Sequence, residues 1–122
     1  MAGRIGGRII EVVKRAMEQR FDPERAGELD AVVEFWVTGR RGGRSENWQL
    51  VIEDGRCRAT DELERDPDLT IEIEGAPFLK LVTGNVGGPA LFLKGDLQLD
   101  GDLMLATQLP RAFRRPRQDS GY

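Results

Sequence analysis

The chain has 122 residues, a formal net charge of −3, a single cysteine and no histidine. A chain of this length predicts one domain with one core. The missing histidine and the lone cysteine exclude an internal disulfide, His/Cys zinc or copper sites, and Ser-His-Asp or Cys-His catalysis. We therefore expect no metal and no cofactor, and the net acidity argues against nucleic acid as a partner.

Targeting and nucleotide-binding patterns are missing as well. No apolar run approaches the roughly twenty residues that span a bilayer, and the N-terminal segment lacks the continuous apolar stretch of a signal peptide. No GxGxxG or GxxxxGK[ST] loop predicts nucleotide binding. We expect a cytoplasmic protein without an integral membrane segment, in which Cys57 is an ordinary strand residue of a reducing compartment.

The first predicted element is an amphipathic helix over residues 8–21. One face carries Ile9, Ile10, Val13, Ala16, Met17 and Phe21, and the other carries Glu11, Lys14, Arg15, Glu18 and Gln19. The apolar stripe is expected to pack on a sheet. Asp22 and Pro23 then give an N-cap and a first helical proline, which predict a short second helix to about residue 28. Residues 8–29 form the predicted N-terminal helical segment.

A four-strand meander is predicted over residues 30–75, because the apolar period changes to two. The expected strands are residues 31–38, a second around Trp48, 56–60 and 69–74. A hairpin turn over residues 39–44 is favoured over a phosphate-binding loop, and Asp54-Gly55 predicts a two-residue hairpin. Residues 61–68 are expected to be a loop. The pattern predicts one apolar face, covered by helices, and one solvated face.

A helix–helix–strand–helix unit is predicted over residues 76–113. Helices are expected over residues 76–82, stopped by Thr83-Gly84, and over 89–93, followed by a strand between Gly95 and Gly101. Asp102 is a predicted N-cap for a helix over 103–109, which Pro110 is expected to stop. Phe113 is expected to pack the chain end onto the body. Residues 114–122 form a basic tail that we interpret as solvated and flexible, although its arginines would also suit phosphate or anionic lipid.

Five motifs follow one another along the chain: Val33-x-Phe35-x-Val37-x-Gly39, the Trp48 strand, the Asp54-Gly55 turn, Pro67-Asp68-Leu69-Thr70-Ile71, and the run from Thr83 to Leu109 with its G-x-L-x-[LIV]-x-G-D strand. Their order and spacing resemble the sterol carrier protein 2 (SCP2) family. The resemblance covers about residues 26–113. Asp96 stands where the family often has lysine, and Gly87-Gly88 precedes Pro89 in this chain.

The resemblance implies an α+β fold with a five-stranded, mostly antiparallel sheet, helices over one face and an apolar tunnel. It also implies a non-enzymatic lipid-binding or carrier domain for a fatty acyl, acyl-CoA, sterol-like or isoprenoid ligand. The candidate tunnel lining comprises the inward apolar positions of strands and helices: Val33, Phe35, Trp48, Leu50, Phe78, Leu81, Val82, Leu91, Phe92, Leu103, Leu105 and Leu109. The same side chains would also serve as plain core.

Two further interpretations stay open. The domain is either a carrier or an accessory module that presents a lipidic substrate to a partner enzyme. A small enzyme of the ketosteroid isomerase type is less favoured, because its base would have to be Asp30, Glu34 or Asp100, and all three occupy solvated positions of the alternation. Transient membrane contact and a dimer, formed through an edge strand or an exposed Trp36, are compatible with the sequence.

Overall fold

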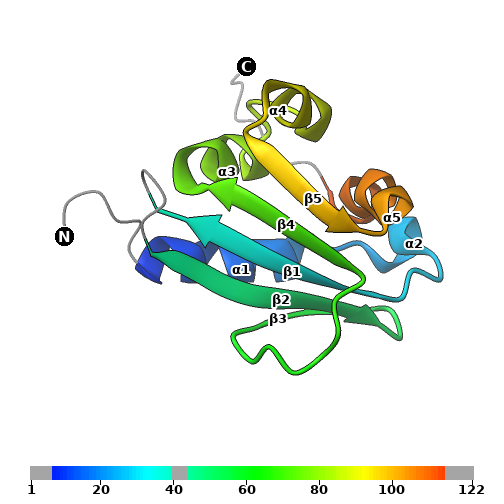
Figure 1. The fold of residues 1–122 in the computed structure, drawn as a ribbon. Helices are drawn as coiled ribbons and strands as arrows, with labels where there is room; N and C mark the ends of the chain where they lie inside the picture. The colour runs from blue at the N-terminus through cyan, green and yellow to red at the C-terminus, as the bar shows by residue number, and fades with distance from the viewer. Residues whose placement is uncertain (1–6, 40–43, 115–122) are drawn as a thin grey trace, which may run out of the picture.

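The computed structural model describes residues 7–39 and 44–114, which form a five-stranded sheet with helices on one side (Figure 1). The N-terminal half and the β-strands up to β4 are α1 Gly7–Arg20, α2 Pro23–Ala26, β1 Ala31–Thr38, β2 Ser45–Glu53, β3 Arg56–Thr60 and β4 Leu69–Glu74. The remaining elements are α3 Gly75–Val82, α4 Gly88–Lys94, β5 Leu97–Gly101, α5 Leu103–Gln108 and the 3₁₀ helix η2 Leu109–Ala112. The predicted α+β class, with a mostly antiparallel sheet, is confirmed.

The strand order β3-β2-β1-β4-β5 corrects the predicted four-strand meander. Only β1, β2 and β3 form a meander; β4 pairs in parallel with β1, and β5 pairs antiparallel with β4. The side chains of Leu69, Ile71 and Ile73 on β4 are all buried, which a central position in the sheet provides and an edge position beside β3 would not. Alternation of apolar residues identifies a strand but not its neighbours.

The turns around β2 follow from local chemistry. Asp54 and Gly55 both have positive φ, 54° and 73°, the conformation that a two-residue type I′ hairpin requires. The β1–β2 connection closes with a hydrogen bond from Gly39 N to Arg44 O of 2.8 Å. The rest of that predicted turn, residues 40–43, lies outside the described residues.

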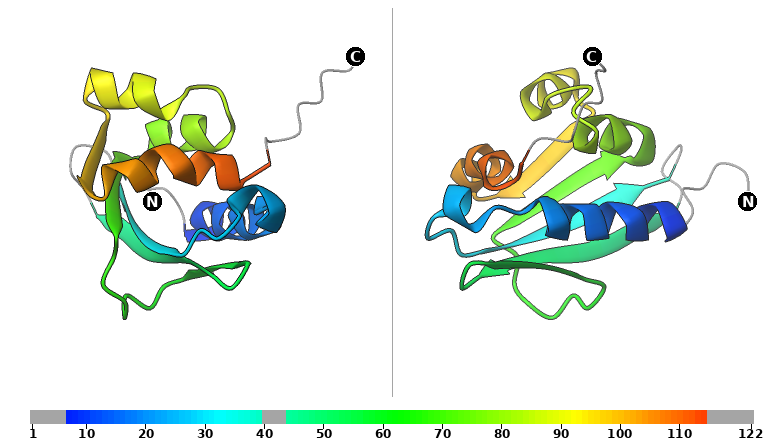
Figure 2. Two further views of the ribbon diagram at one scale, coloured as in Figure 1. Left: turned by 90° about the vertical axis from the view of Figure 1, so that its right-hand side faces the viewer. Right: turned by 180° about the vertical axis from the view of Figure 1, so that it is seen from behind.

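The core lies between one face of the sheet and the helices (Figure 2). Seen from behind, α1, α3 and α5 cross in front of the strands. The inward side chains alternate along each strand as predicted, because a strand's side chains point to opposite faces in turn. The buried strand positions on this face include Val33, Phe35, Val37, Trp48, Leu50, Ile52, Leu69, Ile71, Ile73 and Leu97.

Helix α1 packs through a face rotated from the predicted one. Ile9 is exposed, whereas Lys14, predicted on the polar face, has only 6% of its surface exposed. Its ammonium pairs with Asp61 and, at 2.8 Å, with Glu11. Burial lowers the pKa of Lys14, but the hydrogen bonds with the two carboxylates outweigh it and leave the pKa raised. A lysine is buried here because the loop after β3 supplies a carboxylate.

The sheet face opposite the helices is not fully solvated, which corrects the predicted wet face. The segment between β3 and β4 crosses it, and Gln49 Nε2 donates to Arg65 O at 2.8 Å and to Glu34 Oε1 at 2.9 Å. Glu34 and Gln49 are both buried there. Nothing in the alternation of β1 and β2 predicts this cover, because it comes from a polar loop distant in the sequence.

The C-terminal end is fastened to α1. The α-helix that begins at Leu103 ends at Gln108, one residue before the predicted end, and the chain continues as the 3₁₀ helix η2, in which Pro110 occupies the first turn. Phe113 forms an isolated β-bridge with Phe21, and their rings meet edge to face with centroids 5.8 Å apart. Phe113 thus packs the chain end onto the body, as predicted. Arg114 N donates to Arg20 O at 2.8 Å, so the basic segment begins tied to the body; residues 115–122 lie outside the described residues.

Candidate functional site

Three aromatic rings form the centre of the layer between sheet and helices. Phe35 and Trp48 are cross-strand partners whose rings stack with centroids 4.4 Å apart and an interplanar angle of 12°. Phe78 of α3 stands edge-on over both, at 6.0 Å from Phe35 and 6.4 Å from Trp48. Edge-to-face and offset-stacked pairs are the favoured aromatic geometries. These rings join the strands to the helical cover.

The other predicted lining residues divide into three groups by exposure. Buried positions are Val33, Leu50, Leu91, Leu105 and Leu109; half-buried positions are Leu81 and Val82; exposed positions are Phe92 and Leu103. The buried and half-buried residues belong to one apolar cluster with the aromatic rings. Phe92 and Leu103 lie outside it, on α4 and α5.

One register row links the centre of this layer to the sheet edge. Trp48, Phe35, Ile71 and Leu99 are successive partners across β2, β1, β4 and β5. Trp48 is fully buried, whereas Leu99 is half-buried because β5 is an edge strand. The apolar layer therefore reaches the surface beside β5.

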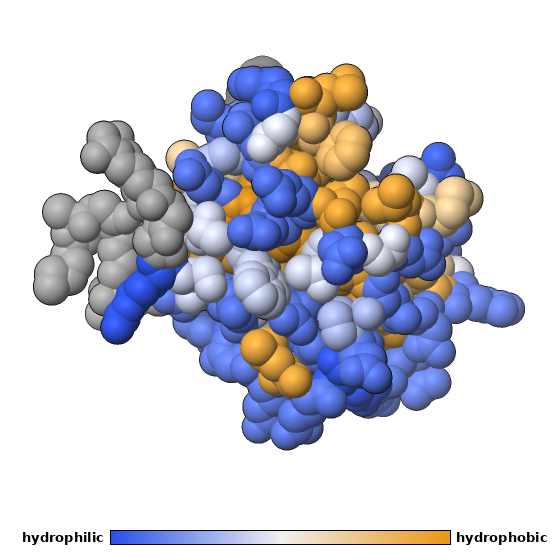
Figure 3. Space-filling model, in the orientation of Figure 1, coloured by the Kyte–Doolittle hydropathy of each residue, from blue (hydrophilic) through white to orange (hydrophobic). Residues whose placement is uncertain are grey.

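An exposed apolar surface flanks that edge. Its members, which we call the β5-edge patch, are Phe92, Leu93, Leu103 and Met104. Leu93 is 84% exposed, and hydrophobic residues gather where α4, β5 and α5 lie, whereas the lower half of this view is mainly hydrophilic (Figure 3). Exposed apolar groups that gather in one place mark contact sites for ligands, membranes or partners. Sequence reasoning placed Phe92 and Leu103 in the lining but did not find Leu93 and Met104.

Two glycines shape the chain around β5. Gly95 ends α4 in the left-handed conformation, with φ 84°, and its N–H donates to Phe92 O at 3.1 Å. Gly101 has φ 118° and lies directly against the backbone of Asp68. Asp102 then caps α5, its Oδ1 accepting from Leu105 N at 3.2 Å. The sharp bends at both ends let α4, β5 and α5 pack within a short stretch of sequence, as predicted.

The indole nitrogen of Trp48 is an unusual polar group in this layer. Trp48 has 0% of its surface exposed, and Nε1 has no hydrogen-bond partner among the residues that the structure describes. Buried N–H groups are nearly always paired. The only sequence signal for this group was a tryptophan at an inward-facing position, which does not reveal whether its N–H is paired.

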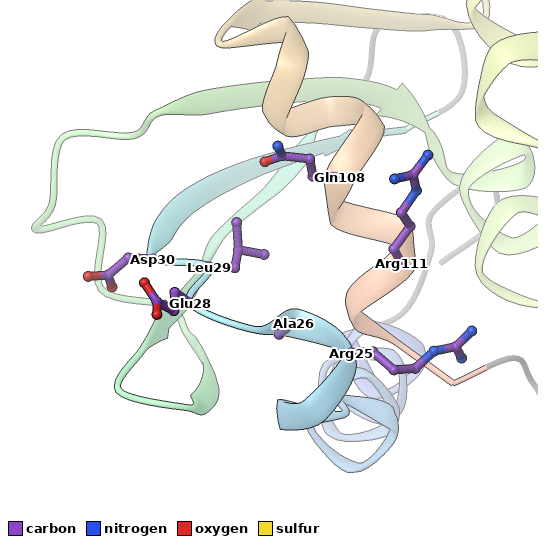
Figure 4. A pocket seen from close by; sticks show the side chains of 7 residues that line it. All are labelled: Arg25, Ala26, Glu28, Leu29, Asp30, Gln108 and Arg111. Atoms are coloured by element: carbon purple, nitrogen blue, oxygen red, sulfur yellow. The ribbon is translucent and has the colours of Figure 1, made fainter.

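A separate open cleft of about 490 Å³ lies between the α2–β1 connection and α5–η2 (Figure 4). Its lining comprises Arg25, Ala26, Glu28, Leu29, Asp30, Gln108 and Arg111. The two arginines lie on one side in Figure 4 and the two carboxylates on the other, with Leu29 between them. Its balanced charge and small apolar area suit a long apolar ligand less well than the β5 edge does.

The three carboxylates nominated for acid–base chemistry do not form a site. Asp30 and Asp100 are exposed, as expected. Glu34 is buried, contrary to expectation, and its carboxylate accepts from Trp36 Nε1 at 2.7 Å and from Gln49 Nε2. Glu34, Thr70 and Asp100 share one register row, but that row lies on the face opposite the aromatic layer. The two carboxylate oxygens of Glu34 thus accept from neighbouring strand residues.

Within residues 7–39 and 44–114, no group of three or more acidic or cysteine side chains lies close enough to hold a metal ion. In the same part of the chain, no helix has both the length and the apolar content needed to cross a membrane.

Comparison with known proteins identifies a match over most of the chain. The family model described as the SCP-2 sterol transfer family matches residues 11–114. Human "Sterol carrier protein 2" is 25% identical over 89 residues, which cover 73% of this chain but only 16% of that protein. The chain thus spans about a sixth of the length of this curated relative.

Solved structures show the same fold. The sterol carrier protein domain 2 of Helicoverpa armigera superposes with a TM-score of 0.67 at 23% identity, covering 84% of this chain and 80% of that one. A palmitated SCP2L2 from Aedes aegypti gives a TM-score of 0.64 at 18% identity, covering 90% of this chain and 96% of that one. At these identities the superpositions carry the fold alone.

Proposed function

Because this chain belongs to the SCP-2 sterol transfer family, we propose that it is a non-enzymatic lipid-binding module. The alkyl part of its ligand lies between the sheet and α3–α5 and reaches the surface beside β5. The ligand is a long apolar molecule of the fatty acyl, sterol-like or isoprenoid kind. The palmitate named for the Aedes aegypti structure belongs to that class.

The observation that carries this proposal is the continuity of apolar surface from the buried core to the β5-edge patch. The register row from Trp48 to Leu99 passes from full burial to partial exposure. Phe92 and Leu103 stand exposed on the helices at either end of the same edge strand. An apolar ligand beside Leu99 would cover side chains that otherwise face water, which is the interaction that drives lipid binding.

The energetics favour such a ligand without any specific chemistry. Each buried methylene contributes about 0.8 kcal/mol, so a twelve-carbon chain gains on the order of 10 kcal/mol before costs. Ordering of the ligand and displacement of side chains offset a large part of this gain. The remainder is enough for a reversible carrier and requires no catalytic residue.

Loading requires the helical cover to move, because Phe78 packs edge-on against both strand aromatics. The cover suits such movement. Helices α3 and α4 have eight and seven residues, and neither has an N-cap side-chain hydrogen bond. Short helices without an N-cap hydrogen bond depend mainly on tertiary packing for their stability. Replacement of that packing by ligand contacts is therefore a small local change rather than unfolding of the sheet.

The direct test is organic extraction of the purified protein, followed by mass spectrometry and by reloading with a fluorescent fatty acid. We expect a stoichiometric apolar molecule, or saturable uptake after delipidation. A protein that carries nothing and takes up no probe contradicts the proposal.

An accessory role is the second candidate, and the β5-edge patch favours it. Phe92, Leu93, Leu103 and Met104 would suit a partner enzyme that receives the ligand at that edge. Co-purification of a stable partner that is lost when Leu93 is replaced by Ser would support this role over free transport. Lipid uptake that persists in Leu93→Ser while the partner is lost would separate the two functions.

A further inference from the structure

The indole N–H of Trp48 is a polar group that packing alone does not explain. It is fully buried, and no acceptor among the described residues lies within hydrogen-bonding reach. An unpaired buried donor costs about 1–3 kcal/mol. Phenylalanine would supply a stacking partner for Phe35 without that cost, so the nitrogen adds an unmet hydrogen-bonding capacity to an otherwise apolar layer.

Two other side-chain donors of the same strands are satisfied. Trp36 Nε1, on the opposite face, donates to Glu34 at 2.7 Å. The Nε2 group of Gln49, which is also 0% exposed, donates both to Glu34 and to Arg65 O. The two tryptophans of the chain thus differ: the one outside the layer has its acceptor, and the one inside has none among the described residues.

Trp48 stands at the inner end of the path described above. Three inter-strand spacings, about 14 Å in total, separate its row position from Leu99 at the edge. The intervening partners, Phe35 and Ile71, are apolar. A ligand whose alkyl chain lies toward the edge would bring its polar atom to Trp48.

The charge of that atom follows from its surroundings. The buried cluster that holds Trp48 includes the apolar side chains of Phe35, Leu50, Ile71 and Phe78. A carboxylate or phosphate buried there would lack a countercharge, at a cost of several kcal/mol. A neutral oxygen needs only one donor, and Trp48 supplies one.

We propose that Trp48 Nε1 donates a hydrogen bond to a neutral oxygen of the bound ligand, a hydroxyl or an ester or ketone carbonyl. This inference rests on the proposed lipid-binding function and narrows it. It assigns the inner end of the site to neutral oxygenated lipids, such as fatty alcohols, esters and sterol-like alcohols, in preference to ionised fatty acids.

The test compares dodecanol with dodecane, both delivered from cyclodextrin to the full chain. In the ¹⁵N-labelled protein, dodecanol is expected to move the Trp48 indole N–H proton downfield, whereas dodecane does not; Trp36→Phe assigns the two indole signals. Trp48→Phe is expected to weaken dodecanol binding alone. The dissociation constant for dodecane divided by that for dodecanol should therefore be about tenfold lower than in the wild-type protein. Trp36→Phe, on the other face, is expected to keep the wild-type ratio.

The outcomes separate the two claims. Two results would overturn the inference while leaving the proposed function intact. In the first, both molecules bind and Trp48→Phe leaves the ratio of their dissociation constants unchanged. In the second, both bind but dodecanol causes no shift of the indole signal that dodecane does not cause. Binding of neither molecule to the wild-type protein overturns the proposed function and this inference together. The wild-type indole measurement decides the question even if Trp48→Phe folds poorly.

Discussion

The carbonyl oxygen of Asp68 lies too close to the position that a β-carbon on Gly101 would take. The same oxygen accepts from Asp102 N at 2.8 Å, and the Asp68 carboxylate accepts from Val32 N at 2.8 Å. Asp68 therefore joins the start of β1, the start of β4 and the β5–α5 junction. This arrangement is possible only because residue 101 has no side chain.

Gly101→Ala should consequently destabilise the protein by about 2–4 kcal/mol, because it adds a clash to an unfavourable φ of 118°. Urea unfolding measures the loss. Gly95→Ala separates the two effects, because Gly95 also has positive φ but has open space where a β-carbon would stand; it should cost about 1 kcal/mol. Equal losses for both variants would contradict the close approach.

The β5-edge patch can be tested with matched leucines. Leu103→Asp should weaken uptake of a fluorescent fatty acid about tenfold, because it removes an apolar contact at the proposed opening. Aspartate is tolerated in the first turn of a helix, so α5 should persist. Leu63→Asp is the control, because Leu63 is similarly exposed, 45% against 55%, on the loop between β3 and β4. Equal weakening by both variants would argue against an opening at β5.

The hydrogen bond between Gln49 and Glu34 predicts a variant whose stability depends on pH. Gln49→Glu would place two carboxylates within the 2.9 Å contact that the amide now makes, and should cost about 3 kcal/mol at neutral pH. Repulsion raises the pKa of the pair in the folded state, so the folded protein binds more protons than the unfolded chain. Stability should therefore return as the pH falls toward about 5.

Thermal unfolding at several pH values measures this effect. Gln98→Glu serves as control. Gln98 is the cross-strand partner of Glu72 on the same sheet face, but both side chains are exposed, so solvent screens their repulsion and the change should stay within about 0.5 kcal/mol. A pH-independent loss in Gln49→Glu would mean that the lost hydrogen bond to Arg65 O, not charge repulsion, is responsible.

Cys57 should react slowly in the folded protein. Burial, with a smaller contribution from Glu18, raises the pKa of its thiol to about 12, against about 8.5 in an unfolded chain. At pH 8 its reaction with a disulfide reagent should be on the order of a thousandfold slower than in urea. Reaction in native buffer at the rate of free cysteine would contradict the buried thiol.

The same shift has a consequence for stability. The folded state holds the thiol proton more tightly, so this stabilisation is present below about pH 8.5 and is lost as the pH rises toward 12. Comparison of the wild-type protein with Cys57→Ala across this range isolates the contribution.

The sequence by itself determined the elements, the inward faces of the strands and the family. Period-two alternation along β1 and β4 depends only on which side chains avoid water, and the Asp54-Gly55 and Gly95 turns depend on local backbone conformation. The family resemblance, read from the order of these motifs, is confirmed by the match over residues 11–114. All of these are properties of short segments.

The tertiary structure alone decided which strands are neighbours and what covers them. Parallel placement of β4 beside β1, burial of Lys14 and Glu34, and exposure of Ile9 and Phe92 each depend on a segment distant in sequence. Alternation records that a face is apolar, but not which element covers it. The N–H of Trp48, which has no partner among the described residues, is the clearest case, because a missing partner is a property of the packed chain and of no single segment.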